Sequence, residues 1–338
     1  MSNHWLPREP AFGSFEGDVP IFEEANAATA DWLKEATGIT GRVSRLTTAA
    51  KHPYGHFRVI GPSRAAFLKV LPAEELQQHQ FADRLSAAAF AAGAAVLPPA
   101  EWMLTPRGPV IGIYSYVPAR YCNAGQNDMS QLGRALALLH CAWRNTSLDR
   151  QVEAASAERM RMLSVRHAEI IAGSGPLGPD PAELQALALS IGEPFAIPAN
   201  GQIVHGDLNR GNVLFDNDTA APTFIDFETA AVSWLPPMVD LVMIVQRICC
   251  DGVHRLEDAV PSVAAFLEAY LAEAGHQTLR SVQELSSGIR WICLRNLCLL
   301  AEVESRGGYV AEDEWRKFLA AANDSSATAL HLSAAFKC

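Results

Sequence analysis

The chain has 338 residues, of which 49% are hydrophobic and 19% are charged. This composition excludes an intrinsically disordered chain and suffices for one large domain or two modest ones. The 27 Lys and Arg residues are outnumbered by 37 Asp and Glu residues, which gives a formal net charge of −10. Because negative charge repels nucleic-acid phosphates and anionic lipids, we expect neither a nucleic acid nor a membrane among the partners.

The cysteines and the N-terminal residues of the sequence indicate the cellular compartment of the protein. The seven cysteines form no CxxC pair and lie mostly in apolar segments, which is typical of reduced core thiols rather than of disulfides or a zinc site. The first residues show no basic stretch followed by an apolar one, as a secretory signal would. We therefore expect a cytoplasmic protein.

The first third of the chain predicts a small antiparallel sheet that carries a helix. An amphipathic helix over residues 21–38 is expected to end at Gly38. Short β-rich runs follow, separated by Gly and Pro turns, and a helical stretch over 74–93 precedes the last of them. These runs are VSRLTT, HFRVI, AAFLKVL and VIGIYSYV.

The remainder of the chain is predicted to be mainly helical. Apolar residues recur there at three- and four-residue spacing in six stretches, and the exception is residues 202–227, which read as two short strands joined by a polar loop. We predict an α+β chain of two lobes, residues 1–117 and 128–338, connected by a hinge over 118–127.

The polar loop contains a group of residues suited to phosphoryl transfer. It reads HGDLNRGN, so that Asp207 and Asn212 lie five residues apart, and Asp226 follows fourteen residues later in IDFE. Transfer of a phosphoryl group needs a carboxylate to orient the attacking hydroxyl and oxygen ligands to hold Mg²⁺ against the phosphates. A short two-stranded hairpin would bring these three side chains together.

The segment HGDLNRGNVLF followed by IDFE resembles the catalytic loop and metal-binding segment of the aminoglycoside phosphotransferase and choline kinase-like family, which has a protein-kinase-like fold. The resemblance implies that Asp207 is the catalytic aspartate and that Asn212 and Asp226 bind Mg²⁺. It implies loop-stabilising and structural roles for His205 and for Asp240, which lies in an Asp-Leu pair shortly downstream. ATP or GTP would be the phosphoryl donor.

The same resemblance suggests upstream residues for the nucleotide. Lys69, in AAFLKVL, is expected to reach the α- and β-phosphates and to pair with an acid on the next helix, for which we choose Asp83. Ser115 and Val117 lie in the segment where family members bind a purine through backbone groups. The loop that would cover the phosphates, TTAAKHPYG, has only one glycine, so Thr47, Thr48 or Lys51 would have to compensate.

The acceptor is expected to be a small molecule, since no activation segment for a peptide follows Asp226. Arg210, close to the catalytic aspartate, is predicted to direct positive charge toward the γ-phosphate. Acids of the helical half would then meet amines, which favours a cationic acceptor such as an aminoglycoside; we considered Glu228, Glu268, Glu302 and Glu304. Choline-like alcohols, sugars and homoserine remain open as acceptors, as does a kinase-like binding protein without turnover.

Overall fold

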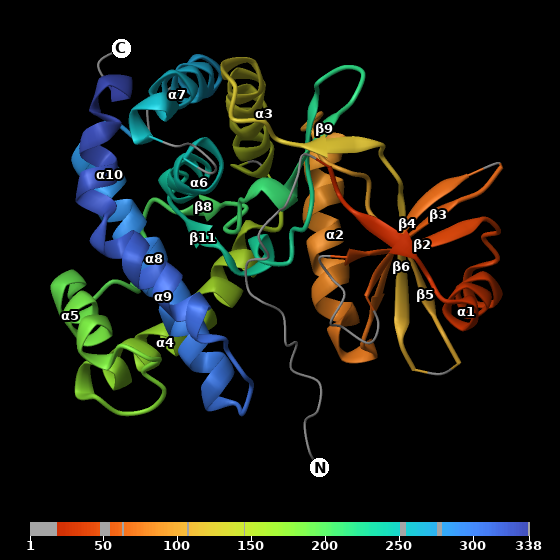
Figure 1. The fold of residues 1–338 in the computed structure, drawn as a ribbon, viewed down its shortest axis with the longest axis horizontal. Coiled ribbons are helices and arrows are strands. Elements are labelled where there is room, and N and C mark those ends of the chain that lie inside the picture. The colour runs from red at the N-terminus through yellow and green to blue at the C-terminus, as the bar shows by residue number, and fades with distance from the viewer. Residues whose placement is uncertain are drawn as a thin grey trace.

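In the computed structural model, residues 19–47, 55–62, 64–106, 108–144, 146–250, 255–275 and 279–336 are described. An antiparallel sheet lies on one side of the molecule and a body of helices on the other (Figure 1). The strands follow the order β1-β2-β3-β4-β6-β5, with bounds Phe22–Glu24 (β1), Arg42–Leu46 (β2), His56–Ile60 (β3), Ala65–Leu71 (β4), Glu101–Leu104 (β5) and Val110–Ser115 (β6).

The sheet has one apolar face, which α1 (Ala27–Thr37) covers (Figure 1). Successive side chains of a strand point to opposite faces, so the residues of β4 divide between the two. Leu68 is fully buried and packs in one cluster with Leu33 of α1. Lys69, the next residue, lines a cleft instead. The alternation of β4 therefore sets the lysine on the face opposite to α1.

The predicted helix over 21–38 begins later than expected, and two strands were missed. The side chain of Asn26 accepts a hydrogen bond from the backbone of Thr29 at 2.9 Å, which caps α1 and fixes its start. Gly38 ends the helix with a φ of 69°, as predicted. The residues before Asn26 form β1, because they complete the hydrogen bonds at the edge of β2. The short edge strand β5 was also not predicted.

Helix α2 (Leu76–Ala91) follows a 3₁₀ turn over Ala73–Glu75 and lies between the sheet and the helical body (Figure 1). Its apolar face belongs to the large core of that body, where Leu85 is fully buried. The indole N–H of Trp143 in α3 also donates to the carbonyl of Leu85 at 3.1 Å. By its packing, α2 is therefore fixed to the helices rather than to α1 and its cluster.

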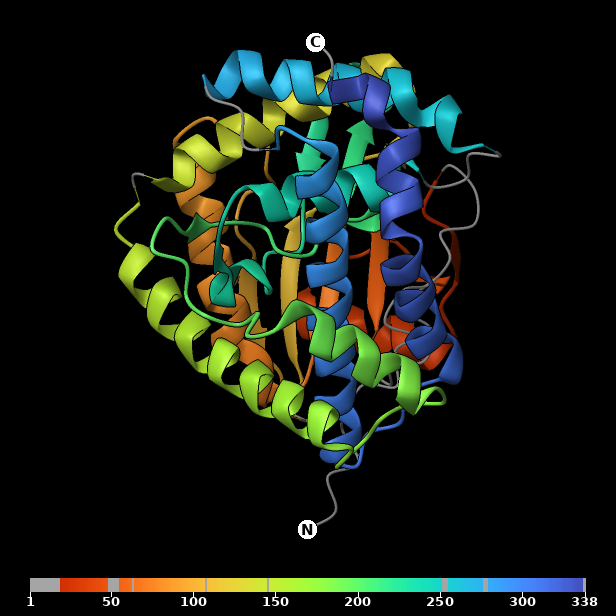
Figure 2. The same cartoon turned by 90° about the vertical axis from the view of Figure 1, so that its left-hand side faces the viewer.

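The helical body contains the six predicted helical stretches, and two short helices, α6 and α10, were not predicted. Helices α3 and α7 lie side by side along one edge of it (Figures 1 and 2). The bounds are Gln126–Arg144 (α3), Asp149–Ala172 (α4), Pro181–Ile191 (α5), Met238–Ile244 (α6), Val260–Ala274 (α7), Val282–Ser305 (α8), Glu312–Asn323 (α9) and Ser325–His331 (α10).

The predicted strand pair within the helical half is also present. It consists of β9 (Val213–Asp216) and β10 (Pro222–Phe224), which residues 217–221 connect, whereas the polar loop HGDLNRGN precedes β9 and does not join the two strands. A short β8 (Gln202–Ile203) lies before that loop and pairs with β11 (Trp234–Leu235). The predicted hinge, residues 118–127, contains β7 (Ala119–Tyr121), which pairs with β9. The division into lobes at this segment stays a prediction.

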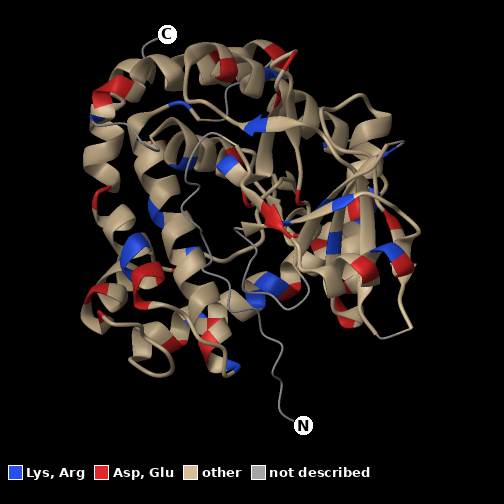
Figure 3. Ribbon diagram, turned by 45° about the vertical axis from the view of Figure 1, so that its right-hand side comes forward, with Lys and Arg blue, Asp and Glu red and all other residues tan. Residues whose placement is uncertain are grey.

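Charged residues are distributed over both halves of the molecule. Figure 3 shows acidic and basic segments on the sheet and on the helices, and neither sign covers one side. In the part of the chain that the structure describes, none of the helices combines the length and the apolar composition that a membrane-spanning helix needs.

Candidate active site

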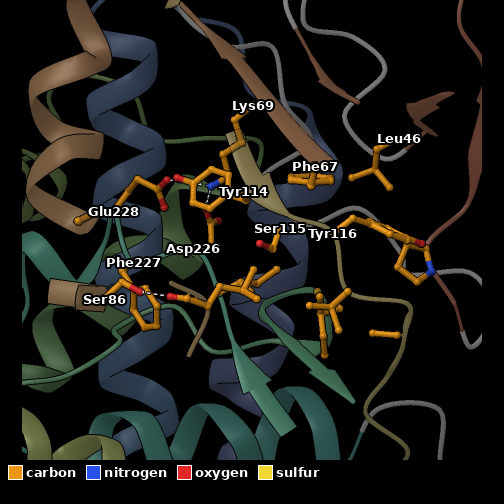
Figure 4. Close-up of a pocket in the computed structure, with 18 of the residues that line it drawn as sticks. Leu46, Phe67, Lys69, Ser86, Tyr114, Ser115, Tyr116, Asp226, Phe227 and Glu228 are labelled. Atoms are coloured by element: carbon orange, nitrogen blue, oxygen red, sulfur yellow. Dashed lines mark hydrogen bonds and ion pairs between the residues drawn. The ribbon is translucent and has the colours of Figure 1, made fainter. Parts of the chain in front are cut away.

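A cleft with about 930 Å³ of empty space, open to solvent, runs between the sheet and the segment that follows β10. Lys69, Asp226 and Glu228 gather at one end of it, whereas Phe67 and Leu46 lie toward the other (Figure 4).

Lys69 is held by two acids from the helical half. Its Nζ lies 2.6 Å from Asp226 Oδ1 and 2.9 Å from Glu228 Oε1. Burial alone would lower the pKa of Lys69, but the charges of these two acids raise it well above its usual value. The lysine is therefore a fixed positive charge inside the cleft.

The predicted pairing of Lys69 with Asp83 is wrong. The carboxylate of Asp83 accepts hydrogen bonds from the indole of Trp102, at 2.5 Å, and from the hydroxyl of Tyr114, at 3.3 Å. Burial raises the pKa of Asp83. Asp83 still lines the cleft, but its short side chain is bound to β5 and β6, and the acid that takes its place beside Lys69 is Glu228.

Glu228 joins the sheet to α2 through a second contact. His79 Nδ1 of α2 lies 2.6 Å from the same Oε1 atom, and its Nε2 lies 3.8 Å from Glu75. Burial opposes protonation of His79, but its contacts with the two glutamates raise its pKa to about 9. For Glu228, Lys69 and His79 outweigh the effect of burial and hold its pKa well below its usual range.

Asp226 occupies a strained backbone position. Its φ of 71° lies in the left-handed region, which residues other than glycine rarely adopt and which costs about 1–3 kcal/mol. Burial and the charge of Glu228 raise the pKa of Asp226 to about 7, against the opposing effect of Lys69. Strain of this kind persists only where the surroundings fix the residue, as they do at active sites.

The loop that carries Asp207 is tied to the segment of Asp226. The amide Nδ2 of Asn212 donates to the backbone carbonyl of Asp207 at 2.7 Å, and the backbone N–H of Ile225 donates to the carbonyl of Asn212 at 3.1 Å. Because Nδ2 of Asn212 is engaged, its Oδ1 is the atom that can bind a cation. The structure thus places Asp207, Asn212 and Asp226 on two connected segments, as the hairpin predicts.

The fully buried carboxylate of Asp240 holds the loop of Asp207 through hydrogen bonds to its backbone. Asp240 accepts from the backbone N–H of His205 at 2.7 Å and of Gly206 at 2.8 Å, and His140 Nε2 lies 3.0 Å from it. Burial alone would raise the pKa of Asp240, but the hydrogen bond from His140 and the nearby imidazoles lower it overall. The ring of His205 lies 2.9 Å from the carbonyl of Ile225, so it connects the two segments.

Gly206 is required by the same turn. Its φ is 75°, and a Cβ added there would lie 2.4 Å from the hydroxyl of Ser233. A side chain would therefore clash as well as strain the backbone.

The arginine that contacts Asp207 is Arg247, with Nη1 2.9 Å from Asp207 Oδ1. Sequence reasoning missed Arg247 and named Arg210 instead. Arg210 lies in the 3₁₀ turn Arg210–Asn212, where its charge interacts with Tyr121 and Cys122 of the hinge segment. The signal available was a single charged residue in a mainly apolar run, LVMIVQRICC.

The remaining predicted residues have these positions. Ser115 and Val117 both line the cleft, on the segment that leaves β6. Thr47 binds the carbonyl of Ile21 through its backbone and its hydroxyl, while Thr48 and Lys51 lie outside the described residues.

The acids considered for the acceptor are engaged elsewhere or exposed. Glu302 pairs with Arg166 at 2.6 Å and with Arg306, Glu304 accepts from the indole of Trp315 at 3.4 Å, and Glu268 is exposed on α7. The structure places none of them in contact with Asp207.

The comparison with known families decides the identity. The sequence profile of the phosphotransferase enzyme family matches residues 55–285. The chain belongs to this family. It is accordingly a small-molecule kinase, and its fold is the α+β, protein-kinase-like fold predicted from the sequence. No curated protein sequence matches the chain.

Solved structures of this fold resemble the kinase over most of its length. The choline kinase of Streptococcus pneumoniae has a TM-score of 0.59 at 12% identity, and the match covers 89% of this chain and 99% of that one. Spectinomycin phosphotransferase in its AMP-bound complex has a TM-score of 0.57 at 15% identity, covering 90% and 97%. An aminoglycoside-3′-phosphotransferase of type VIII has a TM-score of 0.51 at 18% identity, covering 71% and 88%.

Proposed function

We propose that this kinase transfers the γ-phosphoryl group of ATP or GTP to a hydroxyl of a small molecule, with Mg²⁺ held by Asn212 and Asp226. The observation that carries the proposal is the continuous set of contacts from Lys69 through Asp226 and the backbone of Ile225 to Asn212 and Asp207. These contacts connect Lys69 on the sheet with Asp207 of the helical half, and Lys69, Ile225 and Asp226 of this set line the cleft.

The oxygen donors fit magnesium. Among the described residues, no group of three His, Cys, Asp or Glu side chains can hold a metal. Magnesium, however, is commonly bound by one or two protein oxygens and completed by water and phosphate. The Oδ1 of Asn212 and the carboxylate of Asp226 supply two such donors, and the bound ion would neutralise charge on the phosphates.

Each remaining residue has a role that follows from its place. Lys69 would bind the phosphates as a fixed charge, and Asp207 would orient the acceptor hydroxyl and accept its proton. Asp83, Ser115 and Val117 line the cleft, where the backbone of the segment after β6 would bind the base. Structures of relatives of this fold contain AMP, ADP or a non-hydrolysable ATP analogue, which supports a nucleotide here.

Two acceptor classes follow from different observations. The likeness to spectinomycin phosphotransferase and choline kinase supports the cationic acceptor predicted from the sequence, and with it a role in antibiotic resistance. The side chains around Asp207 are basic, which favours an anionic acceptor. A cytoplasmic location remains part of the proposal.

The experiment compares Asp207→Asn with Asp218→Asn, a control on the exposed turn between β9 and β10. Phosphoryl transfer is measured with labelled nucleotide, and binding of a non-hydrolysable ATP analogue is measured by calorimetry. We expect Asp207→Asn to lower kcat at least about 100-fold with nucleotide affinity retained.

Near-normal turnover by Asp207→Asn would contradict the assigned role. Mg²⁺-dependent nucleotide binding without transfer to any acceptor would favour a kinase-like binding protein, a candidate motivated by the absence of an acid beside Lys69 on α2.

A further inference from the structure

Three arginines from separate helical segments, the basic cluster, surround the loop of Asp207. Arg247 lies in the π-helical turn Val245–Cys249, with Nη1 2.9 Å from Asp207 Oδ1. Arg295 of α8 donates from Nη1 to the carbonyl of Gly206 at 3.1 Å, one residue before Asp207. Arg159 of α4 lies within electrostatic reach of the same carboxylate. The basic cluster thus borders the place where an acceptor hydroxyl must lie.

Two members of the basic cluster have buried donors that no described residue satisfies. Arg295 is only 3% exposed, and its Nε has no hydrogen-bond partner; the Nε of Arg159 is buried and unpartnered as well. Buried polar groups are hydrogen-bonded in the great majority of cases. Unsatisfied guanidinium donors beside a reactive carboxylate point to a ligand that brings its own hydrogen-bond acceptors.

The guanidinium groups also repel one another. Burial lowers the pKa of Arg295 to about 9, and the charges of Arg159 and Arg247 contribute. Burial lowers the pKa of Arg159, with the charge of Asp207 opposing it. Because burial disfavours the charged guanidinium groups of Arg295 and Arg159, an anion bound next to them would stabilise these charges.

Two acids of the described part of the chain lie near the basic cluster, and both have other roles. Asp207 is the carboxylate needed for the acceptor, and Asp240 is engaged by His140 and by two backbone N–H groups. On the other side, Lys317 of α9 lies within electrostatic reach of Arg247, and its own partner is Glu314 at 2.6 Å. Among the described residues, neither Arg159 nor Arg295 has an acid as an ion-pair partner, and the Nε of each has no hydrogen-bond acceptor.

Resting on the phosphotransfer proposed above, we infer that the acceptor is a hydroxyl compound with an anionic group, a carboxylate or a phosphate, which binds Arg159 and Arg295. The planar guanidinium fork fits either oxyanion through paired hydrogen bonds. Arg247 is a positioning residue, because it engages one oxygen of Asp207 and leaves Oδ2 to meet the hydroxyl.

The reaction is balanced with this acceptor. The acceptor oxygen forms the new bond to the γ-phosphorus, and the bond from that phosphorus to the bridging oxygen breaks. The nucleoside diphosphate leaves, and the hydroxyl proton passes to Asp207. The anionic group takes no part in the bond changes and serves recognition alone.

Matched pairs of acceptors test the inference. We would measure acceptor-dependent nucleoside diphosphate release with 4-hydroxybutyrate against 1,4-butanediol, and with glycerol 3-phosphate against glycerol; choline and spectinomycin provide cations. We expect turnover with an acidic member and at least about 10-fold lower kcat/KM with its neutral twin. The two pairs distinguish carboxylate from phosphate. Turnover with the cations alone would overturn the inference.

A matched pair of variants tests whether Arg159 binds the acidic acceptor. Arg159→Met removes a member of the basic cluster, and Arg161→Met removes an exposed arginine two residues away on α4. We expect Arg159→Met to raise KM for the acidic acceptor about 10-fold or more and to leave KM for the nucleotide within about twofold, since the arginine acts on the acceptor. A rise confined to the nucleotide KM would show instead that the basic cluster binds the γ-phosphate.

An anion-binding measurement covers the case in which no acceptor tested is turned over. Thermal unfolding is followed with sulfate or succinate, against chloride at equal ionic strength, with and without AMP-PNP and Mg²⁺. We expect sulfate or succinate to raise Tm of the wild type and of Arg161→Met, but not of Arg159→Met. Equal shifts in all three proteins would overturn the inference. Loss of the AMP-PNP shift alone would instead contradict the proposed function.

Discussion

The ammonium of Lys69 lies 2.9 Å from the carboxylate of Glu228, an acid from the segment after β10 and not from α2. Helix α2 contributes His79, which binds the same oxygen at 2.6 Å. Glu228 thus serves the sheet and α2 together, and its charge keeps the lysine from pairing with Asp226 alone.

Glu228→Gln should weaken both nucleotide and magnesium binding. Glutamine keeps the size of the side chain but removes its charge, so Lys69 would bind Asp226 alone and compete with the metal for it. We expect kcat/KM for the nucleotide to fall about 10- to 100-fold and the Mg²⁺ concentration for half-maximal activity to rise. Steady-state kinetics at varied nucleotide and Mg²⁺ check this. Glu75→Gln, which removes only the 3.8 Å contact to His79, is the control.

Asn212→Ala should raise the Mg²⁺ requirement, because it removes the Oδ1 donor and the hydrogen bond to the carbonyl of Asp207. The half-saturating Mg²⁺ concentration is expected to increase about 10-fold or more. A magnesium titration of activity measures it, with Asn217→Ala on the exposed turn as the control. An unchanged magnesium curve would remove Asn212 from the metal site.

Asp240→Asn should destabilise the protein, because Asp240 binds the backbone of the catalytic loop. An amide group there would turn a donor toward the backbone N–H groups of His205 or Gly206, and His140 would lose its charged partner. We expect the free energy of unfolding to fall by about 2–5 kcal/mol, as for other broken buried charge networks. Urea denaturation measures this loss. A variant as stable as the wild type would show that the loop does not depend on Asp240.

The contact between His79 and Glu228 should make stability depend on pH. The pKa of His79 is about 9 in the folded state and close to its ordinary value of 6.5 when unfolded, so the folded protein holds this proton more tightly. The stabilisation is complete below pH 6.5 and is lost as pH rises toward 9. We expect a loss of about 1–3 kcal/mol over this range that His79→Gln does not show. Urea denaturation of both proteins at pH 6 and pH 9.5 checks it.

The motif around Asp207 was predictable because its residues are close in sequence. The spacing of Asp207, Asn212 and Asp226 implies a loop and a hairpin, and the structure contains both. Lys69 was named from its place in the apolar run AAFLKVL, and the structure places it on the face of β4 that lines the cleft. Local periodicity also predicted the helical half, since an amphipathic helix is visible in its own sequence.

The partners of these residues depend on packing between distant segments, and the sequence does not show that packing. Glu228 is 159 residues from Lys69, and a search for the acid on the next helix led to Asp83. Arg247 is 40 residues from Asp207, inside an apolar run that reads as core. The edge strand β1 was missed because its pairing with β2, a contact between separate segments, is what makes it a strand.

The anchoring of α2 in the helical body has a mechanical consequence for the cleft. His79 of this helix contacts Glu228, while its Asp83 accepts hydrogen bonds from Trp102 of β5 and Tyr114 of β6. Helix α2 therefore connects the sheet that carries Lys69 to the segment that carries Glu228, and a rotation of the sheet against the helical body would strain contacts on one side of α2 or the other. The separation of Lys69 and Glu228 is thus set by the way α2 holds the sheet against the helical body.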